Sequence, residues 1–377
     1  MADMFSRLQQ TSTFRNDRFA RWDGFPIGII GCGLVGSHLA VEAVRSGANV
    51  WLCDFEQVAE HNLGTQVHHP GCSKVASLLE LCRAIRLGCA DGVESDIRHV
   101  GVGVLRKCGA LVDCTDDRGL AISLTEISNG LGLPLFRLAV DGSGRTEMGR
   151  VLHSDGGRGG ACQVCSWTAE DLPRDFVRQP CPGAQTVERP PTLAGGALAS
   201  TIASLGLLQI QRCVTGNDVE LVRNREVIVD WTHMEIISAE VMRSEKCISG
   251  HTGWNLREMR GAEIETLSDI FEIAGSLVDG KEFHIAPYGH PISISAGCEC
   301  GEVVLGAGSQ WATRPECPQC QSEMNWNVDT GLNALNESQA KELGAWDLTL
   351  SQLGLPEEGA LFTVIVDDAP RERLVLA

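Results

Sequence analysis

The sequence predicts a doubly wound α/β fold built on a mostly parallel sheet, and three observations support this fold class. An apolar run at 27–30 leads into the glycine-rich turn GCGLVGS, and a helical apolar pattern follows over 34–45. Strand and helix patterns then continue to alternate to about residue 155. Acidic residues also follow the ends of two predicted strands, at the edge where such sheets bind ligands.

The first strand, turn and helix have the pattern of a nucleotide-binding unit. Gly31, Gly33 and Gly36 form the fingerprint GxGxxG. Such a turn brings the backbone close to a phosphate and directs a helix N-terminus at its negative charge. A second strand over 49–53 leads to Asp54, 18 residues after Gly36, where a carboxylate can bind ribose hydroxyls.

The segment after this acid carries polar side chains that a simple dinucleotide site does not need. Asn62, Gln66 and Lys74 follow within twenty residues, on a stretch that His-Pro-Gly prevents from being one helix. The polyphosphate of ATP requires amide and cationic donors in addition to a glycine turn. Lys74 opens an amphipathic helix and could supply that charge, although taken alone it is better explained as a solvated lysine in a first helical turn.

The next predicted elements are a strand over 111–114 that leads into the sequence DCTDD, a helix over 119–131 and a strand over 133–140. Asp113 and Asp116 thus lie at a strand end that faces the nucleotide turn. A carboxylate there can hold Mg²⁺ against the phosphates, or it can cap the helix that follows. The two roles are compatible at different positions of the motif.

The remainder of the chain predicts a long irregular crossing segment over 141–192 and a buried helix over 193–212. From about residue 255 a polar helical stretch precedes a cysteine-bearing segment, 293–328, and a linker then leads to a last strand, 361–366. The expected domains are a polar, basic N-terminal arm over 1–24, a nucleotide-binding domain over 25–255 with a crossover loop at about 160–192, and a smaller C-terminal domain over 256–377.

Composition restricts the partners and the compartment. The formal net charge of −18 argues against nucleic acid and anionic membranes, since both attract basic surfaces. We expect no membrane span and no signal peptide, because the apolar runs are too short. Sixteen cysteines, several of them at metal-ligand spacing, indicate a reducing compartment with bound zinc, and so a cytoplasmic protein.

The paired cysteines form two sets with zinc-ligand spacing. The first is a CxxC pair and a distant CxxxH pair: Cys162, Cys165, Cys247 and His251. The second has zinc-ribbon spacing: Cys298, Cys300, Cys317 and Cys320. Four protein ligands leave no open coordination position, so both zinc sites are expected to be structural. A redox role for CxxC would need a thioredoxin-like context, which the sequence lacks.

Cys181 lies outside these pairs, in the proline- and arginine-bearing loop RQPCPGAQTVERPP. An unpaired cysteine on such a loop is a candidate nucleophile, and Arg178 and Arg189 nearby would favour its thiolate. From the residues alone, an ordinary loop cysteine is the favoured interpretation.

Taken in order, these blocks resemble the ThiF/MoeB-type adenylyltransferases, a superfamily that includes ubiquitin-activating enzymes. The resemblance covers roughly 10–255. The matching blocks are GCGLVGS, DFEQVAEHNLGTQ, GCSK, DCTDD, ACQVC, QPCPGAQ with LAGGALASTIASLGLLQIQR, and MRSEKC. The resemblance implies a Rossmann-like sheet with a zinc-bearing crossover region, to which this chain adds a C-terminal zinc ribbon.

The resemblance also implies ATP- and Mg²⁺-dependent adenylation of the C-terminal glycine of a ubiquitin-like protein. Capture of the acyl group as a thioester on Cys181 and transfer to a conjugating enzyme would follow. By position, Asp54 would bind ribose, Asn62 and Lys74 the phosphates, and Asp116 the Mg²⁺. A homodimer is implied as well. The ribbon resembles additions found in bacterial ubiquitin-like conjugation systems, and is expected to dock the carrier protein or a downstream enzyme.

One departure from the family pattern lies in the phosphate-binding block, where Thr65 replaces the family's arginine. Arg118, Arg137 or an N-terminal arginine of a second subunit could replace that contact. The second pair of zinc ligands also departs, since it is CxxxH instead of CxxC, which a tetrahedral site tolerates.

Three alternatives stay open. A sulfur-carrier adenylyltransferase of thiamine or molybdopterin type would share the adenylation chemistry. A nicotinamide-dependent oxidoreductase would explain the glycines and Asp54, but not Asn62, Lys74 and Asp116. A catalytically silent scaffold subunit is the third alternative, and Thr65 is the feature that favours it.

Overall fold

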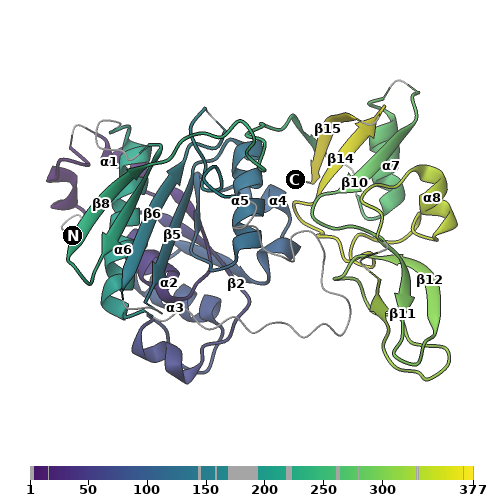
Figure 1. Ribbon diagram of the computed structural model, residues 1–377, viewed down its shortest axis with the longest axis horizontal. Helices are drawn as coiled ribbons and strands as arrows, with labels where there is room; N and C mark the ends of the chain where they lie inside the picture. Colours follow the sequence, from purple (N-terminus) through teal and green to yellow (C-terminus); the bar gives the residue numbers. More distant parts are fainter. Residues whose placement is uncertain are drawn as a thin grey trace. The chain divides into compact units, whose positions relative to one another are not determined.

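A computed structural model describes the chain except for residues 1–3, 16, 143–145, 158, 169–193, 218–222, 260–263, 279, 328, 330, 368 and 377. The described residues divide into two units (Figure 1). The first comprises the described residues up to 253, apart from residues 98–104, which group with residues 254–376 in the second.

The first unit contains an eight-stranded sheet in the order β3-β2-β1-β4-β5-β6-β7-β8. Its strands are β1 (Pro26–Ile30), β2 (Asn49–Asp54), β3 (Ala90–Glu94), β4 (Ala110–Asp113), β5 (Leu135–Asp141), β6 (Met148–Ser154), β7 (Arg225–Asp230) and β8 (Glu235–Glu240). The first five strands pair in parallel, and the last four form antiparallel pairs from β5 onward. The predicted α/β fold with a mostly parallel, Rossmann-like sheet is thereby confirmed.

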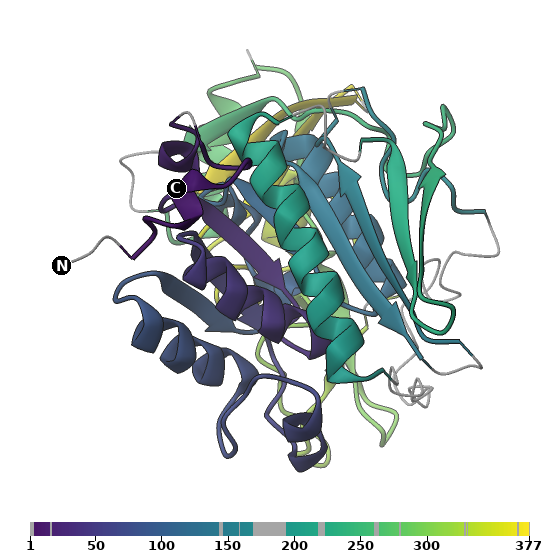
Figure 2. The same cartoon turned by 90° about the vertical axis from the view of Figure 1, so that its left-hand side faces the viewer.

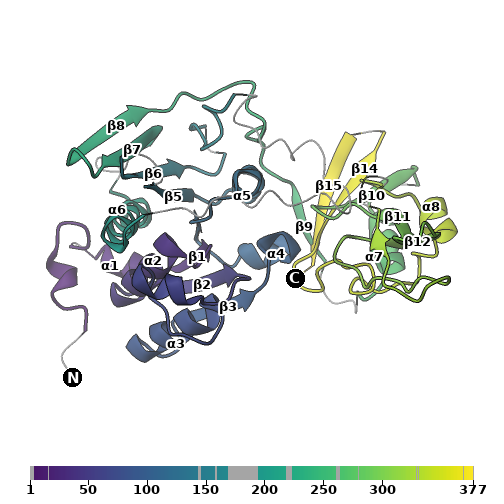
Figure 3. The ribbon, with the colours of Figure 1, turned by 60° about the horizontal axis from the view of Figure 1, so that its bottom comes forward.

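Helices cover both faces of this sheet. The main ones are α2 (Leu34–Arg45), α3 (Lys74–Ile85), α5 (Arg118–Leu131) and α6 (Gly196–Thr215). Contacts join α2 to α3 and α6, and α6 crosses in front of the sheet in Figure 2. In Figure 3, α5 and α6 lie on opposite sides of β5, so the sheet has a helical layer on each face.

The predicted buried helix is α6, which begins at Gly196 and ends at Thr215, a few residues later than expected. It is the one helix in the described chain that is long and apolar enough to cross a membrane by length and composition. Its apolar side chains, among them Ile202 and Ile210, are instead buried in the same core as α2 and the sheet. Contacts with α2, β5 and β6 therefore account for its composition.

The N-terminal residues differ from the polar arm that the sequence predicts. After a short 3-10 turn, η1 (Leu8–Gln10), and a helical turn, α1 (Phe19–Trp22), the aromatic side chains of Phe14 and Trp22 are buried in the core of the first unit. The regular spacing of arginines hid this apolar set, because aromatic residues in such short turns produce no helical period.

The crossing segment is also more regular than predicted, since it contains β6. The antiparallel strands β7 and β8 were not predicted either. The residues of β8 are exposed at most positions, and β7 carries charged residues at both of its ends. Between β3 and β4 the chain forms a short 3-10 turn, η3 (Ile97–His99), and a helical turn, α4 (Val102–Leu105).

Among the described residues of 254–376, the second unit combines two small sheets with the helices α7 and α8. A four-stranded sheet has the order β10-β14-β15-β9, and a three-stranded sheet the order β12-β11-β13. The elements are β9 (Leu256–Met259), α7 (Leu267–Gly275), β10 (Phe283–Pro287), β11 (Ser293–Gly297), β12 (Val303–Gly308), β13 (Asn325–Trp326), α8 (Glu337–Glu342), β14 (Leu361–Val366) and β15 (Ala369–Leu376). The last predicted strand, 361–366, is β14, and the predicted linker contains α8.

Candidate nucleotide site and metal centres

The glycine turn between β1 and α2 has a backbone that only glycine accommodates at two of its positions. Gly31 has a φ of +88°, in the left-handed region. A Cβ on Gly36 would collide with the carbonyl oxygen of Gly31, so the first turn of α2 lies directly against the end of β1. The predicted fingerprint is therefore a tight strand-to-helix turn whose backbone is open to close approach by a ligand.

Asp54, at the end of β2, is hydrogen-bonded to this turn. Its Oδ2 accepts from the backbone N–H of Cys32 at 2.7 Å, and its Oδ1 accepts from the backbone N–H of Glu56 at 2.9 Å. The carboxylate is thus held beside the turn, at the carboxyl end of the parallel strands where the sequence predicts a ribose. Each oxygen retains a lone pair for a further donor.

Lys74 is buried beside the same turn, with 5% of its surface exposed. A Cβ built on Gly33 would lie 3.9 Å from its Nζ, so the absent side chain of Gly33 leaves room next to the amine. Ser73 caps α3 by accepting from the N–H of Ala76, which fixes Lys74 as the first helical residue. The interpretation of Lys74 as a solvated lysine is wrong, because its side chain is buried and ion-paired with Glu56.

A second acidic residue, missed in the sequence, pairs with this lysine. Glu56 Oε2 accepts a hydrogen bond from Lys74 Nζ and forms an ion pair with it. The sequence did offer a signal for this acid, since Glu56 lies two residues after Asp54 in the same block. Its distance of eighteen residues from Lys74 gave no indication that the two side chains meet.

Asn62 and Gln66 lie on and just after a short 3-10 helix, η2 (Glu60–Gly64). Asn62 is buried, and its Oδ1 accepts from the backbone N–H of Ala59 at 2.8 Å. The backbone N–H of Gln66 donates to the carbonyl of Asn62, and Gln66 Oε1 is buried without a hydrogen-bond partner. The backbone oxygen of Thr65 accepts from His38 Nε2 at 3.1 Å.

His68 is a further residue at the glycine turn that sequence reasoning missed. Its Nε2 donates to the carbonyl oxygen of Cys32 at 2.8 Å. Burial lowers the pKa of His68 from 6.5 to about 4, so the ring is neutral near pH 7. The sequence signal was the pair His68-His69 before Pro70, in the segment that leads to Lys74.

The three aspartates of the DCTDD segment have different environments and roles. Asp113 is fully buried at the end of β4, and burial raises its pKa in spite of the Arg137 guanidinium 3.9 Å away. Asp117 caps α5, since its Oδ1 accepts from the N–H groups of Gly119 and Leu120. Asp116 is exposed. Of the two proposed candidates for Mg²⁺, Asp116 is therefore the one that solvent and a metal ion can reach.

The first predicted zinc set comes together in space. The ligand atoms of Cys162, Cys165, Cys247 and His251 all lie within 4.8 Å of one another. The Sγ of Cys162 is 3.6 Å from that of Cys165 and 3.5 Å from that of Cys247. Two thiolates on one tetrahedral zinc are about 3.7 Å apart, given zinc–sulfur bonds of about 2.3 Å. The arrangement fits zinc.

Neighbouring polar groups orient this cluster. Ser249 Oγ lies 3.2 Å from Cys247 Sγ, and Asn129 Nδ2 on α5 donates to Ser249. The hydrogen bond from Cys162 lowers the pKa of Cys247, which favours the thiolate form that binds metal. Such supporting contacts fix ligand geometry in zinc sites.

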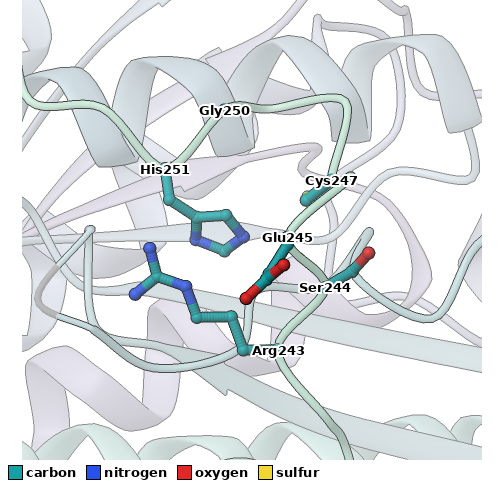
Figure 4. Close-up of a pocket in the computed structure, with 6 residues that line it drawn as sticks. All are labelled: Arg243, Ser244, Glu245, Cys247, Gly250 and His251. Atoms are coloured by element: carbon teal, nitrogen blue, oxygen red, sulfur yellow. The ribbon is translucent and has the colours of Figure 1, made fainter.

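A pocket of about 480 Å³ opens beside this cluster. Figure 4 shows the residues that line it: Arg243, Ser244, Glu245, Cys247, Gly250 and His251. Because Cys247 and His251 also belong to the metal set, the pocket adjoins that centre.

The second predicted zinc set also comes together, in the second unit. Cys298, Cys300, Cys317 and Cys320 place their sulfurs within 4.8 Å of one another. Cys298 and Cys320 are 3.4 Å apart, and Cys300 and Cys317 3.5 Å. Cys300 and Cys320 are exposed, in contrast to the buried Cys162 and Cys165. This set too fits zinc, in a ribbon formed by β11, β12 and β13.

Cys181, the predicted nucleophile, and its neighbours Arg178 and Arg189 lie outside the described residues. Its role therefore stays a prediction.

The comparisons with known proteins agree with this geometry. Residues 5–248 match the model of the ThiF family. Solved structures with a similar fold include three of Escherichia coli MccB, in complexes with ATP, with MccA-N7isoASN and with succinimide. They are 16%, 16% and 17% identical to this chain, with TM-scores of 0.54, 0.55 and 0.53. Each similarity covers 66% of this chain, and 75%, 75% and 74% of the MccB chain respectively. No curated protein sequence matches the chain.

Proposed function

Because this chain belongs to the ThiF family, we propose that it is an adenylyltransferase that uses ATP to activate the C-terminal carboxylate of a protein. The observation that carries the proposal is the buried amine of Lys74 beside Gly33 in the nucleotide turn. A dinucleotide-dependent oxidoreductase has no need of a buried cation at this position, whereas a triphosphate does.

In the proposed reaction, a carboxylate oxygen of the substrate attacks the α-phosphorus of ATP. The bond to the bridging oxygen breaks, pyrophosphate leaves, and an acyl adenylate forms. Lys74 would neutralise phosphate charge, Asn62 and Gln66 would orient the phosphates, and Asp54 would bind the ribose. Mg²⁺, which neutralises phosphate charge when bound, would be held by the exposed carboxylate of Asp116.

The proposed substrate is a ubiquitin-like protein with a C-terminal glycine. This proposal is supported by the seven sequence blocks in family order, including the block around Cys181. The thiolate of Cys181 would attack the acyl carbonyl, AMP would leave, and the thioester would pass to a conjugating enzyme. Solved structures of MccB, which has a similar fold, contain MccA-N7isoASN or ATP, so this fold accommodates a partner molecule as well as a nucleotide.

The missing family arginine is proposed to be replaced by Arg118. Of the candidates, Arg137 is directed to Asp113 and the ring of Trp167, and an N-terminal arginine of a second subunit stays an alternative. Arg118 is exposed at the first position of α5, next to Asp116 and Asp117. We further propose a cytoplasmic homodimer with zinc in both cysteine sets.

The test is ATP–pyrophosphate exchange with a ubiquitin-like protein that ends in glycine, compared with the same protein lacking that glycine. Exchange that requires the glycine and is lost in Lys74→Met supports the proposal. A band shift that thiols reverse and that Cys181→Ala abolishes, with exchange retained, supports the thioester. Exchange without any such shift would favour the sulfur-carrier alternative. No exchange with any carrier would favour a silent scaffold.

A further inference from the structure

The contact between Lys74 and Glu56 joins two side chains with different access to water. The side chain of Lys74 is 7% exposed, whereas that of Glu56 is 55% exposed. The lysine is thus fixed inside the site, and the glutamate reaches it from the solvent side. An ion pair of this kind can open by movement of the glutamate alone.

The backbone around Glu56 explains why its side chain meets the lysine. The N–H of Lys74 donates to the carbonyl of Glu56 at 3.0 Å, and that of Val58 donates to the carbonyl of Cys72, also at 3.0 Å. Gln57 and Ser73 form an antiparallel bridge between these bonds. The segment after β2 is therefore paired with the start of α3 in a fixed register, which brings residue 56 next to residue 74.

A buried ammonium group needs an anion, because removal of its charge from water is costly when no partner compensates. In this structure Glu56 supplies that anion. A nucleotide phosphate would supply it as well, and more strongly, since a phosphate carries more negative charge and more acceptor oxygens. Both anions cannot occupy the same face of one amine.

We propose that Glu56 is an internal counter-ion that competes with the phosphates of the nucleotide for Lys74. It holds the amine in place in the empty enzyme and leaves for solvent when ATP binds. This inference rests on the proposed function, in which Lys74 is a phosphate ligand. It predicts that Glu56 weakens ATP binding although it lies within the ATP site.

The test measures the binding of ATP, tripolyphosphate and adenosine to the full-length protein without Mg²⁺. Glu56→Gln should bind ATP and tripolyphosphate about threefold more tightly than wild type, the size expected from removal of a half-exposed ion pair. Adenosine binding should be unchanged. Glu56→Asp keeps the charge but shortens the side chain, so its affinity for ATP and tripolyphosphate should lie between those of Glu56→Gln and wild type. Glu80→Gln removes the same charge from an exposed position of α3 and serves as the matched control.

Equal phosphate affinities in Glu56→Gln and Glu80→Gln would overturn the inference. Weaker binding of ATP in Glu56→Gln only when Mg²⁺ is present would also overturn it, because Glu56 would then be a metal ligand. If wild type binds adenosine and ATP equally well, Lys74 is no phosphate ligand, and the inference fails together with the proposed role of this residue. If wild type binds neither, the proposed function itself is wrong.

Discussion

The carboxylate of Asp54 accepts a 2.7 Å hydrogen bond from the backbone N–H of Cys32, and so joins the end of β2 to the glycine turn that follows β1. Its other oxygen accepts from the backbone N–H of Glu56, the residue whose side chain forms the ion pair with Lys74. One acid therefore positions both the turn and the segment that carries the counter-ion, in addition to its proposed contact with ribose.

Asp54→Asn should weaken ATP binding about tenfold or more and lower the melting temperature. The amide keeps one acceptor but presents an N–H₂ donor where a backbone N–H needs an acceptor, and hydrogen bonds to charged groups contribute about 1.5–3 kcal/mol. Binding titrations and thermal denaturation measure the two effects. Asp91→Asn, which changes an exposed carboxylate on the adjacent strand β3, is the control. Equal effects of the two variants would contradict the role of Asp54.

Asp116 and Asp117 are neighbours with separable roles. Asp117→Ala removes the cap of α5 and should lower the free energy of unfolding by about 1 kcal/mol. Asp116→Ala should leave stability within about 0.5 kcal/mol, as is usual for an exposed residue, but should raise the Mg²⁺ concentration required for ATP–pyrophosphate exchange. Chemical denaturation and a Mg²⁺ titration test the pair. A stability loss in Asp116→Ala with normal Mg²⁺ dependence would reverse the assignment.

The nucleotide-binding half of the fold was predictable because its signals are local. The helix expected over 34–45 is α2 without any shift, since its apolar residues recur at helical spacing and glycines precede it. The two cysteine sets were predictable for a similar reason, because zinc fixes the spacing of ligands within each pair. The sequence also predicted that an aspartate of DCTDD caps the following helix, but it could not show which of the three aspartates does so. The structure assigns that cap to Asp117.

What the sequence could not predict depends on contacts between distant segments. The burial of Lys74 depends on the bridge between Gln57 and Ser73, which no periodic pattern indicates. The strand β8 was missed because its side chains are almost all exposed, so it lacks the alternation of a half-buried strand. Trp22 was hidden among polar residues until its contact with the core was known.

Metal removal should distinguish the two cysteine sets. Zinc analysis of the purified protein is expected to give two ions per chain. A chelator or a thiol-reactive mercurial should release zinc first from the ribbon, where Cys300 and Cys320 are exposed, and later from the buried Cys162 and Cys165. Release is followed with a zinc-sensitive dye. Cys300→Ser should remove only the early phase, and loss of the late phase in that variant would contradict the order.

The neutral His68 ring should make stability depend on pH. Its pKa in the folded protein, about 4, lies below its ordinary value of 6.5, so the unfolded chain takes up the proton first. Stability from this group is therefore complete above about pH 6.5 and declines as the pH falls towards 4, by less than about 1.4 kcal/mol per unit because the ring is only partly buried. His153 and His290 have similarly low pKa values and add to the slope in wild type.

His68→Gln keeps an N–H donor for the carbonyl of Cys32 but cannot titrate. Melting temperatures measured between about pH 7 and pH 5 should fall less in this variant than in wild type, and parallel curves would show that His68 remains solvated.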